Sequence, residues 1–271
     1  METARIRLQN RLNELKHDAK KALGQNFLIS DHVISKIIQA TESSLDQLQK
    51  KSLIEIGPGL GAITDYLVKL DCSYQAIELD RSLFQYWDDK KIKILNQDAL
   101  QADWSQFDSD ILVSNLPYQI SSSIVIEKSL EPYKLEIMIL MFQKEVAQRI
   151  RAVKQTEHYG MLSVMAQEFW KMETVCEAGP VDFFPSPKIA SRVLKFSLKS
   201  SDILDRKKYL SYLKQCFHQR RRILKSNLPS IHSEGVTNWL AAQNISEKAR
   251  AEELSPEQFK NLYLFLNLNK N

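Results

Sequence analysis

Four consecutive residues, Asn115-Leu116-Pro117-Tyr118, follow a short apolar run at residues 111–114 that has the length of a strand. Asn115 offers a side-chain amide oxygen, and Pro117 biases Leu116 toward an extended backbone that aims the Leu116 carbonyl. Two acceptors beside the Tyr118 ring suit an exocyclic amine on a flat heterocycle. Acceptors pointed at the amine hydrogens would favour a pyramidal nitrogen and expose its lone pair to an electrophilic methyl group. The tetrapeptide therefore indicates methyl transfer to the N6 amine of adenine, although an ordinary turn is the alternative for such a motif alone.

A glycine-rich turn at residues 57–61 lies about sixty residues earlier, between an apolar run at residues 52–56 and a helix-like stretch at residues 62–68. Strand, glycine turn and helix are the opening of a nucleotide-binding β-α-β unit, in which Gly57 can adopt positive φ and let a ligand approach the backbone. The turn also satisfies the dinucleotide pattern, with Ala62 in place of the third glycine. A nicotinamide enzyme and a tight turn without a ligand are therefore alternatives at this point.

Two acidic residues follow further strand-like runs. Glu78 ends the run at residues 74–77, where a carboxylate can accept hydrogen bonds from both ribose hydroxyls of a cofactor. Asp98 follows the run at residues 91–95 and could accept from an adenine amine, although an isolated Asp is more often a helix N-cap or part of a turn. Because ligands bind beyond the carboxyl ends of parallel strands, we expect Glu78, Asp98 and Asn115 to converge with the glycine turn.

The length of 271 residues allows one large domain and one small one. Strands and helices alternate from residue 53 to about residue 148, which predicts an α/β domain with a mainly parallel sheet covered on both faces. A hairpin of strands near 171–177 and 190–198 should close this sheet. From about residue 202 the pattern becomes helical, with apolar stripes that suit a small-domain core. The expected domains are residues 1–200 and a small all-helical domain at residues 201–271.

The net charge of +4 is unevenly distributed. Residues 1–25 carry six Lys/Arg and three Asp/Glu, residues 201–271 carry twelve and seven, and the middle of the chain is mildly acidic. Arg220, Arg221, Arg222 and Lys225 form the densest basic cluster, which could bind RNA phosphates or could be a solvated helix face.

The three cysteines and five histidines have no metal-like spacing, and nothing indicates a disulfide framework. We therefore expect no metal and a reducing, cytoplasmic location. The N-terminus lacks the apolar core of a signal peptide, and no apolar run is long enough to cross a bilayer, so no membrane association is expected.

Eight short motifs in order give the chain a family resemblance from about Lys20 to its C-terminus. They are Leu23-Gly24-Gln25-Asn26-Phe27-Leu28, Glu55-Ile56-Gly57-Pro58-Gly59, Ile77-Glu78-Leu79-Asp80, Gln97-Asp98-Ala99, Asn115-Leu116-Pro117-Tyr118, Gln143-Lys144-Glu145-Val146, Tyr159-Gly160-Met161-Leu162-Ser163-Val164 and Phe183-Phe184-Pro185-Ser186-Pro187-Lys188. The chain resembles the ribosomal RNA adenine N6-dimethyltransferases, in their bacterial small-subunit branch. Two departures are Gln119, where the family often has Asn, and Ser186, which interrupts a run of prolines.

The resemblance implies a Rossmann-like methyltransferase domain that uses S-adenosylmethionine. It implies that six positions line the cofactor, namely Asn26, Leu28, Gly57, Glu78, Asp98 and Asn115. The implied substrate is a pair of adjacent adenines in the 3′-terminal hairpin of 16S rRNA, within the small ribosomal subunit, and the implied role is in the biogenesis of that subunit. We expect the enzyme to act as a monomer.

Two aromatic faces are needed to replace the stacking that a flipped base loses, and each is worth roughly 1–3 kcal/mol. Tyr118 could supply one face, and the resemblance makes Phe183 the other. The alternative is that Phe183 and Phe184 are both core residues.

Three other functions remain open on sequence grounds. A resistance-type methylase acting on one adenine of 23S rRNA differs mainly in overall similarity and in its C-terminal domain. A ribosome-assembly factor would need the RNA-binding surface but not the intact cofactor motifs. A nicotinamide dehydrogenase would have no obvious use for the tetrapeptide that begins at Asn115.

Overall fold

A computed structural model of the chain describes residues 2–15, 25–131 and 135–268. The chain divides into two compact units, the first made of Met1–Ile124, Pro132–Ala147 and Met172–Leu198, and the second of Val125–Glu131, Gln148–Lys171 and Lys199–Asn271. The second unit thus includes two segments that the sequence places in the first domain. The expected division between residues 200 and 201 stays a prediction.

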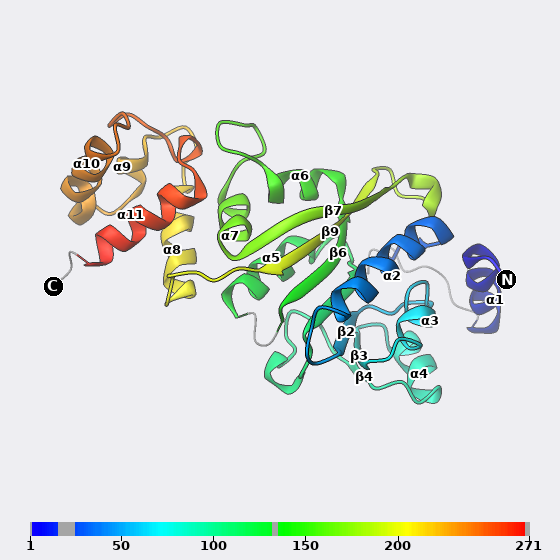
Figure 1. Ribbon diagram of the computed structural model, residues 1–271. Coiled ribbons are helices and arrows are strands. Elements are labelled where there is room, and N and C mark those ends of the chain that lie inside the picture. Colours follow the sequence, from blue (N-terminus) through cyan, green and yellow to red (C-terminus); the bar gives the residue numbers. More distant parts are fainter. Residues whose placement is uncertain (1, 16–24, 132–134, 269–271) are drawn as a thin grey trace. The chain divides into compact units, whose positions relative to one another are not determined.

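Strands and helices alternate through the first unit, and helices dominate the end of the chain (Figure 1). The strands are β1 Phe27–Leu28, β2 Ser52–Ile56, β3 Ser73–Glu78, β4 Ile94–Asn96, β5 Ile111–Asn115, β6 Ile137–Gln143, β7 Trp170–Ala178, β8 Phe183–Phe184 and β9 Ser191–Leu198. The α-helices are α1 Ala4–Leu15, α2 Asp31–Leu45, α3 Thr64–Leu67, α4 Arg81–Asp89, α5 Ser121–Leu130, α6 Lys144–Arg151, α7 Met161–Phe169, α8 Arg206–Cys216, α9 Leu224–Asn227, α10 Ser233–Ala242 and α11 Pro256–Leu268.

Seven strands form one sheet in the order β4-β3-β2-β5-β6-β9-β7. The pairs among β4, β3, β2, β5 and β6 are parallel, and β9 runs antiparallel to β6. The α/β class with a mainly parallel sheet is therefore confirmed, and β7 and β9 are neighbours as the expected closing hairpin requires. The chain order reverses direction across the sheet between β2 and β5, which is where ligands bind in open sheets of this kind.

Both faces of the sheet are buried, which explains why its strands read as continuous apolar runs. Alternate residues point to opposite faces. One set clusters with apolar residues of α2 and includes Leu53, Ile111, Val113, Ile137 and Ile139. The alternate set, also buried, includes Ile54, Leu112, Met138 and Leu140.

A separate two-stranded ribbon joins distant parts of the first unit. In it β1 pairs antiparallel with β8, so that Phe27 lies opposite Phe184 and Leu28 opposite Phe183. The sequence did not predict this pairing, because two-residue strands carry too little periodicity to be recognised.

The second unit has an aromatic core. Tyr209 stacks on Tyr212, and the Tyr263 ring meets the Tyr209 ring edge-on with centroids 5.1 Å apart. The Tyr159 hydroxyl donates to the Leu254 carbonyl over 2.7 Å, which ties the loop before α7 to the segment before α11. The apolar stripes of α8 and α11 are buried, so their prediction as core is confirmed.

One carboxyl group, that of Glu55 on β2, lies entirely inside the first unit. The Tyr74 hydroxyl donates to its Oε2, whereas its Oε1 has no hydrogen-bond partner among the described residues. Burial raises the pKa of Glu55 from 4.5 to about 8, against the opposing effect of the Tyr74 hydrogen bond. Glu55 is therefore protonated at neutral pH.

The raised pKa predicts how stability changes with pH. The contribution of the protonated Glu55 carboxyl to stability is fully present below pH 4.5. It is lost as the pH rises toward about 8, because Glu55 ionises at lower pH in the unfolded chain than in the folded protein. We expect Glu55→Gln, which cannot ionise, to remove this decline, which is at most about 1.4 kcal/mol per pH unit. Urea denaturation of both proteins between pH 5 and pH 8 measures the difference, and parallel pH profiles would contradict the prediction.

Candidate functional site

One cavity collects most of the residues that the sequence singles out. It is lined, among others, by Asn26, Gly57, Glu78, Asp98, Asn115, Leu116 and Tyr118. These residues lie just before β1 or at the carboxyl ends of β2, β3, β4 and β5. The parallel pairing of those strands is what brings them to one edge of the sheet.

The glycine turn forms one wall of this cavity. Gly57 has a φ of +68°, and a Cβ atom added to it would meet no atom within 4 Å. Its N–H donates to the Ile77 carbonyl over 2.8 Å, which fixes the turn to β3. The open space beside Gly57 admits a ligand against the bare backbone.

Glu78 anchors the turn from the end of β3. The Gly59 N–H donates to its Oε2 over 3.1 Å, and the Asp80 N–H donates to its Oε1 over 2.9 Å. Burial raises the pKa of Glu78, although the bonds from Asp80 and Gly59 oppose that shift. Each oxygen keeps a further lone pair for a ligand, because a carboxylate has about four acceptor sites.

Asp98 lies at the rim of the same cavity, after β4. Its Oδ1 accepts from the Leu100 N–H over 2.9 Å, which is the turn-forming role expected of an isolated Asp. Asp98 therefore combines this turn with a place in the cavity wall.

The amide of Asn115 is oriented by a residue 89 positions away. Its Nδ2 donates to the Asn26 carbonyl over 3.1 Å, and no described residue donates to its Oδ1. The carbonyls of Pro117 and Tyr118 accept from Ile120 N–H and Ser121 Oγ, at 3.1 Å and 2.9 Å. The Leu116 carbonyl, by contrast, has no donor among the described residues. Two neighbouring acceptors are thus left for a ligand.

Tyr118 contributes a half-buried ring to the cavity. Its hydroxyl lies 2.9 Å from Ser191 Oγ at the start of β9, so the ring is fixed from the antiparallel part of the sheet. Burial raises the pKa of the Tyr118 hydroxyl, which stays neutral at physiological pH. Ser191 could not be recognised from the sequence, because a single serine at a strand start is common.

Two of the expected site residues do not line this cavity, although Leu28 lines a smaller cavity beside it together with Gly57 and Asn115. Leu28 and Phe183 face each other in the β1–β8 ribbon and both belong to the hydrophobic core, with exposed fractions of 1% and 3%. The Phe183 ring would have to leave this core to reach a base, whereas Phe184 is 46% exposed. The roles of Leu28 in cofactor binding and of Phe183 in stacking stay predictions. Leu23 and Gly24 of the first motif lie outside the described residues.

Phe27 is the aromatic residue that the sequence reasoning missed. It lines the cavity in place of Leu28, since neighbours in a strand point to opposite sides. A Cβ added to Gly59 would lie 3.5 Å from the Phe27 ring, so the ring packs directly on the glycine turn. The alternation of side chains within Asn26-Phe27-Leu28 could have indicated it.

The basic cluster of the second unit is not uniform. Arg220 forms an ion pair with Glu252 and donates to the carbonyls of Thr156 and Glu157. Arg221 and Arg222 are exposed, and no ion pair joins either of them to a described residue. Arg220 is therefore a structural residue, and the two arginines after it are the candidates for phosphate contacts.

Within the described ranges no helix is long and apolar enough to cross a membrane, and no group of three His, Cys, Asp or Glu side chains is arranged to hold a metal ion.

Comparison with known proteins decides the family. The model of the ribosomal RNA adenine dimethylases matches residues 16–268. The chain is 50% identical to the ribosomal RNA small subunit methyltransferase A of Bdellovibrio bacteriovorus, over 97% of this chain and 98% of that protein. The chain belongs to the ribosomal RNA adenine dimethylase family. The protein of the same name from Staphylococcus carnosus is 32% identical, over 96% of this chain and 93% of its own length.

Solved structures agree on the fold. A dimethyladenosine transferase from Plasmodium falciparum matches with a TM-score of 0.74 and 22% identity, over 89% of this chain and 98% of that one. The 23S rRNA methyltransferase ErmE matches with a TM-score of 0.63 and 24% identity, over 89% of this chain and all of that one. These structures confirm the predicted Rossmann-like methyltransferase fold, whereas the family match and the curated relatives confirm the family and an enzymatic activity of adenine dimethylation in ribosomal RNA.

Proposed function

We propose that this ribosomal RNA adenine dimethylase uses S-adenosylmethionine to dimethylate the N6 amines of two adjacent adenines in the 3′-terminal hairpin of 16S rRNA, within the small ribosomal subunit. The relatives at 32–50% identity carry small-subunit names, whereas the 23S enzyme shares 24% identity. This difference favours the small-subunit target over the 23S rRNA alternative. The cytoplasm is the expected location.

The two unclaimed acceptors, Asn115 Oδ1 and the Leu116 carbonyl, are the observation that carries the proposal. A primary amine on a base has two hydrogens, and two adjacent acceptors can hold both. Because the Asn26 carbonyl already binds the Asn115 amide nitrogen, the amide oxygen is pre-aimed and needs no reorientation during the reaction. Proximity and orientation then supply most of the acceleration.

The cavity also suits the cofactor. Bound S-adenosylmethionine supplies an electrophilic methyl group. The bare backbone at Gly57 accepts close contact, and Glu78 has lone pairs for the ribose hydroxyls. Asp98, which lines the same cavity, would accept from the adenine amine of the cofactor. The Tyr118 ring offers a stacking face for the target base.

The decisive experiment is mass spectrometry of the adenines in small-subunit RNA incubated with and without the protein. Dimethylation of two adjacent adenines in the 3′-terminal hairpin supports the proposal. Modification confined to 23S rRNA, or no modification with intact RNA binding, contradicts it and favours the methylase or assembly-factor alternative.

Removing the Asn115 amide should affect the rate more than binding. We expect Asn115→Ala to lower kcat roughly 10²–10³-fold at saturating cofactor, as loss of one preorganised hydrogen bond in the transition state does elsewhere. RNA affinity should stay within about twofold of wild type. Asn115→Asp, which keeps an oxygen acceptor but cannot donate to Asn26, should retain intermediate activity. Near-normal turnover of the Ala variant would remove Asn115 from the mechanism.

Glu78 predicts the pH dependence of cofactor binding. Only the ionised carboxylate can accept from both ribose hydroxyls without donating, and burial raises its pKa. The affinity of the wild type for S-adenosylmethionine, measured by calorimetry, should therefore weaken as the pH falls, beginning at a higher pH than an ordinary Glu would give. Glu78→Gln should weaken binding by roughly 1–3 kcal/mol and lose this pH dependence. If Glu78→Gln shows the same affinity and the same pH profile of S-adenosylmethionine binding as the wild type, Glu78 does not bind the cofactor.

Arg221 and Arg222 should contribute to the salt dependence with which the protein binds small ribosomal subunits. Changing both to Gln removes two phosphate contacts, so the slope of log affinity against log salt should fall by about 1.5 and binding should weaken. Arg220→Gln is the matched control, because the Arg220 guanidinium already pairs with Glu252. It should lower thermal stability and leave the salt slope unchanged. If the double variant keeps the wild-type slope, the pair is a solvated surface.

A further inference from the structure

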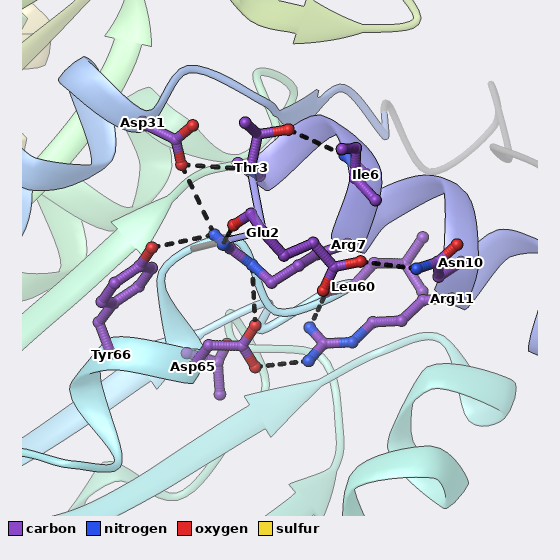
Figure 2. Close-up of polar contacts among 12 residues, drawn as sticks. Glu2, Thr3, Ile6, Arg7, Asn10, Arg11, Asp31, Leu60, Asp65 and Tyr66 are labelled. Atoms are coloured by element: carbon purple, nitrogen blue, oxygen red, sulfur yellow. Dashed lines mark hydrogen bonds and ion pairs between the residues drawn. The ribbon is translucent and has the colours of Figure 1, made fainter.

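The N-terminal helix α1 lies directly against the glycine turn (Figure 2). Its Leu8 side chain is buried in a cluster with Phe27 and Leu60. A second, smaller cavity adjoins the first: both are lined by Phe27, Gly57, Gly59 and Asn115. Residues Ala4, Arg7, Leu8 and Arg11 of α1 line that smaller cavity. α1 is therefore part of the wall around the turn.

Arg11 connects α1 to the turn itself. Its Nη1 donates to the Leu60 carbonyl over 2.6 Å, and its Nη2 donates to Asp65 Oδ1 over 2.6 Å. The guanidinium carbon lies 5.4 Å from the centroid of the Trp87 ring. The same Trp87 donates its indole N–H to the Gly59 carbonyl over 2.8 Å. Arg11 and Trp87 thus hold successive carbonyls of the turn.

The last glycine of the turn makes room for this pair. Gly61 has a φ of +83°, and a Cβ there would lie 2.0 Å from Arg11 Nη1 and 2.8 Å from the Trp87 ring. Gly57 differs, because its missing side chain faces open space in the cavity. One glycine therefore admits a ligand, and the other admits the arginine that holds the turn.

Arg7 offers a comparison on the same helix. It donates to the Tyr66 hydroxyl over 3.1 Å and lies 3.5 Å from Asp65, the same carboxylate that Arg11 binds. No hydrogen bond joins Arg7 to residues 57–61 within the described part of the chain. Both arginines fasten α1 to α3 through Asp65, but only Arg11 also holds the turn.

We propose that Arg11 is a positioning residue for cofactor binding, which sets the glycine turn by holding the Leu60 carbonyl and packing against Trp87. This proposal rests on the proposed use of S-adenosylmethionine. The turn has two outer carbonyls, those of Gly59 and Leu60, and both must be held for Gly57 to keep its open face toward the cavity. A turn without the Arg11 bond samples more conformations, and the cofactor must bear the cost of ordering it.

Calorimetry with S-adenosylmethionine on the full chain tests this role. Arg11→Ala should raise Kd about tenfold, as expected for one lost charge-assisted hydrogen bond. Arg7→Ala, the matched control, should leave Kd within about twofold. Arg11→Lys, which can reach either Asp65 or the Leu60 carbonyl but cannot bridge them, should recover part of the affinity. At saturating cofactor kcat of Arg11→Ala should match wild type, so that the change appears in KM alone.

Amide hydrogen exchange in the protein without cofactor gives an independent readout. Residues 58–63 should exchange faster in Arg11→Ala than in wild type or Arg7→Ala. Equal increases of Kd in Arg11→Ala and Arg7→Ala would show that the docking of α1 as a whole determines cofactor affinity, which would overturn the proposal. An unchanged Kd in both variants would overturn it as well. If Arg11→Ala does not fold, Arg11→Lys takes its place. The proposal is then overturned if Arg11→Lys has the Kd of the wild type and the same amide hydrogen exchange at residues 58–63. Wild-type protein that fails to bind S-adenosylmethionine would instead reject the proposed function.

Discussion

The parallel register of β2, β3, β4 and β5 is the constraint on which the site depends. Ile56 pairs with Ile77, and Glu78 pairs with Asn96, so the residues that follow these strands emerge at one edge. A shift of one residue in any pair would exchange the faces of every side chain in that strand. The apolar runs that fill both faces of the sheet therefore end where the polar residues of the site emerge. The core and the site are specified by the same pattern.

The sequence predicts the parts of the site that follow from this rule. Gly57, Glu78, Asp98 and Asn115 each follow a recognisable strand, and the structure places all four around one cavity. Contacts across long sequence separations could not be read in the same way. The bond from Asn115 to the Asn26 carbonyl spans 89 residues, and the link from Tyr118 to Ser191 spans 73. No local pattern encodes such pairs, because they depend on how separate elements pack.

The helical end of the chain shows the same division. The apolar stripes of α8 and α11 predict a core, and the structure buries them. The basic run that follows α8 looks uniform in the sequence, yet the exposed Arg220 forms an ion pair with Glu252, whereas Arg221 and Arg222 have no ion pair with a described residue. Charge density alone could not separate them, because the partners of Arg220 come from other segments. The β1–β8 ribbon was missed for a related reason, and it is what places Phe183 in the core rather than on the cavity wall.

The two sides of the cavity are anchored to different parts of the fold. The Asn115 amide is fixed by the segment before β1, whereas the Tyr118 hydroxyl is fixed by Ser191 on β9. Substitution of Ser191 can therefore move the Tyr118 ring while the acceptors at Asn115 and Leu116 stay in place. Such an arrangement lets one scaffold acquire a new nucleobase context by change at the start of one strand, without rebuilding its catalytic edge.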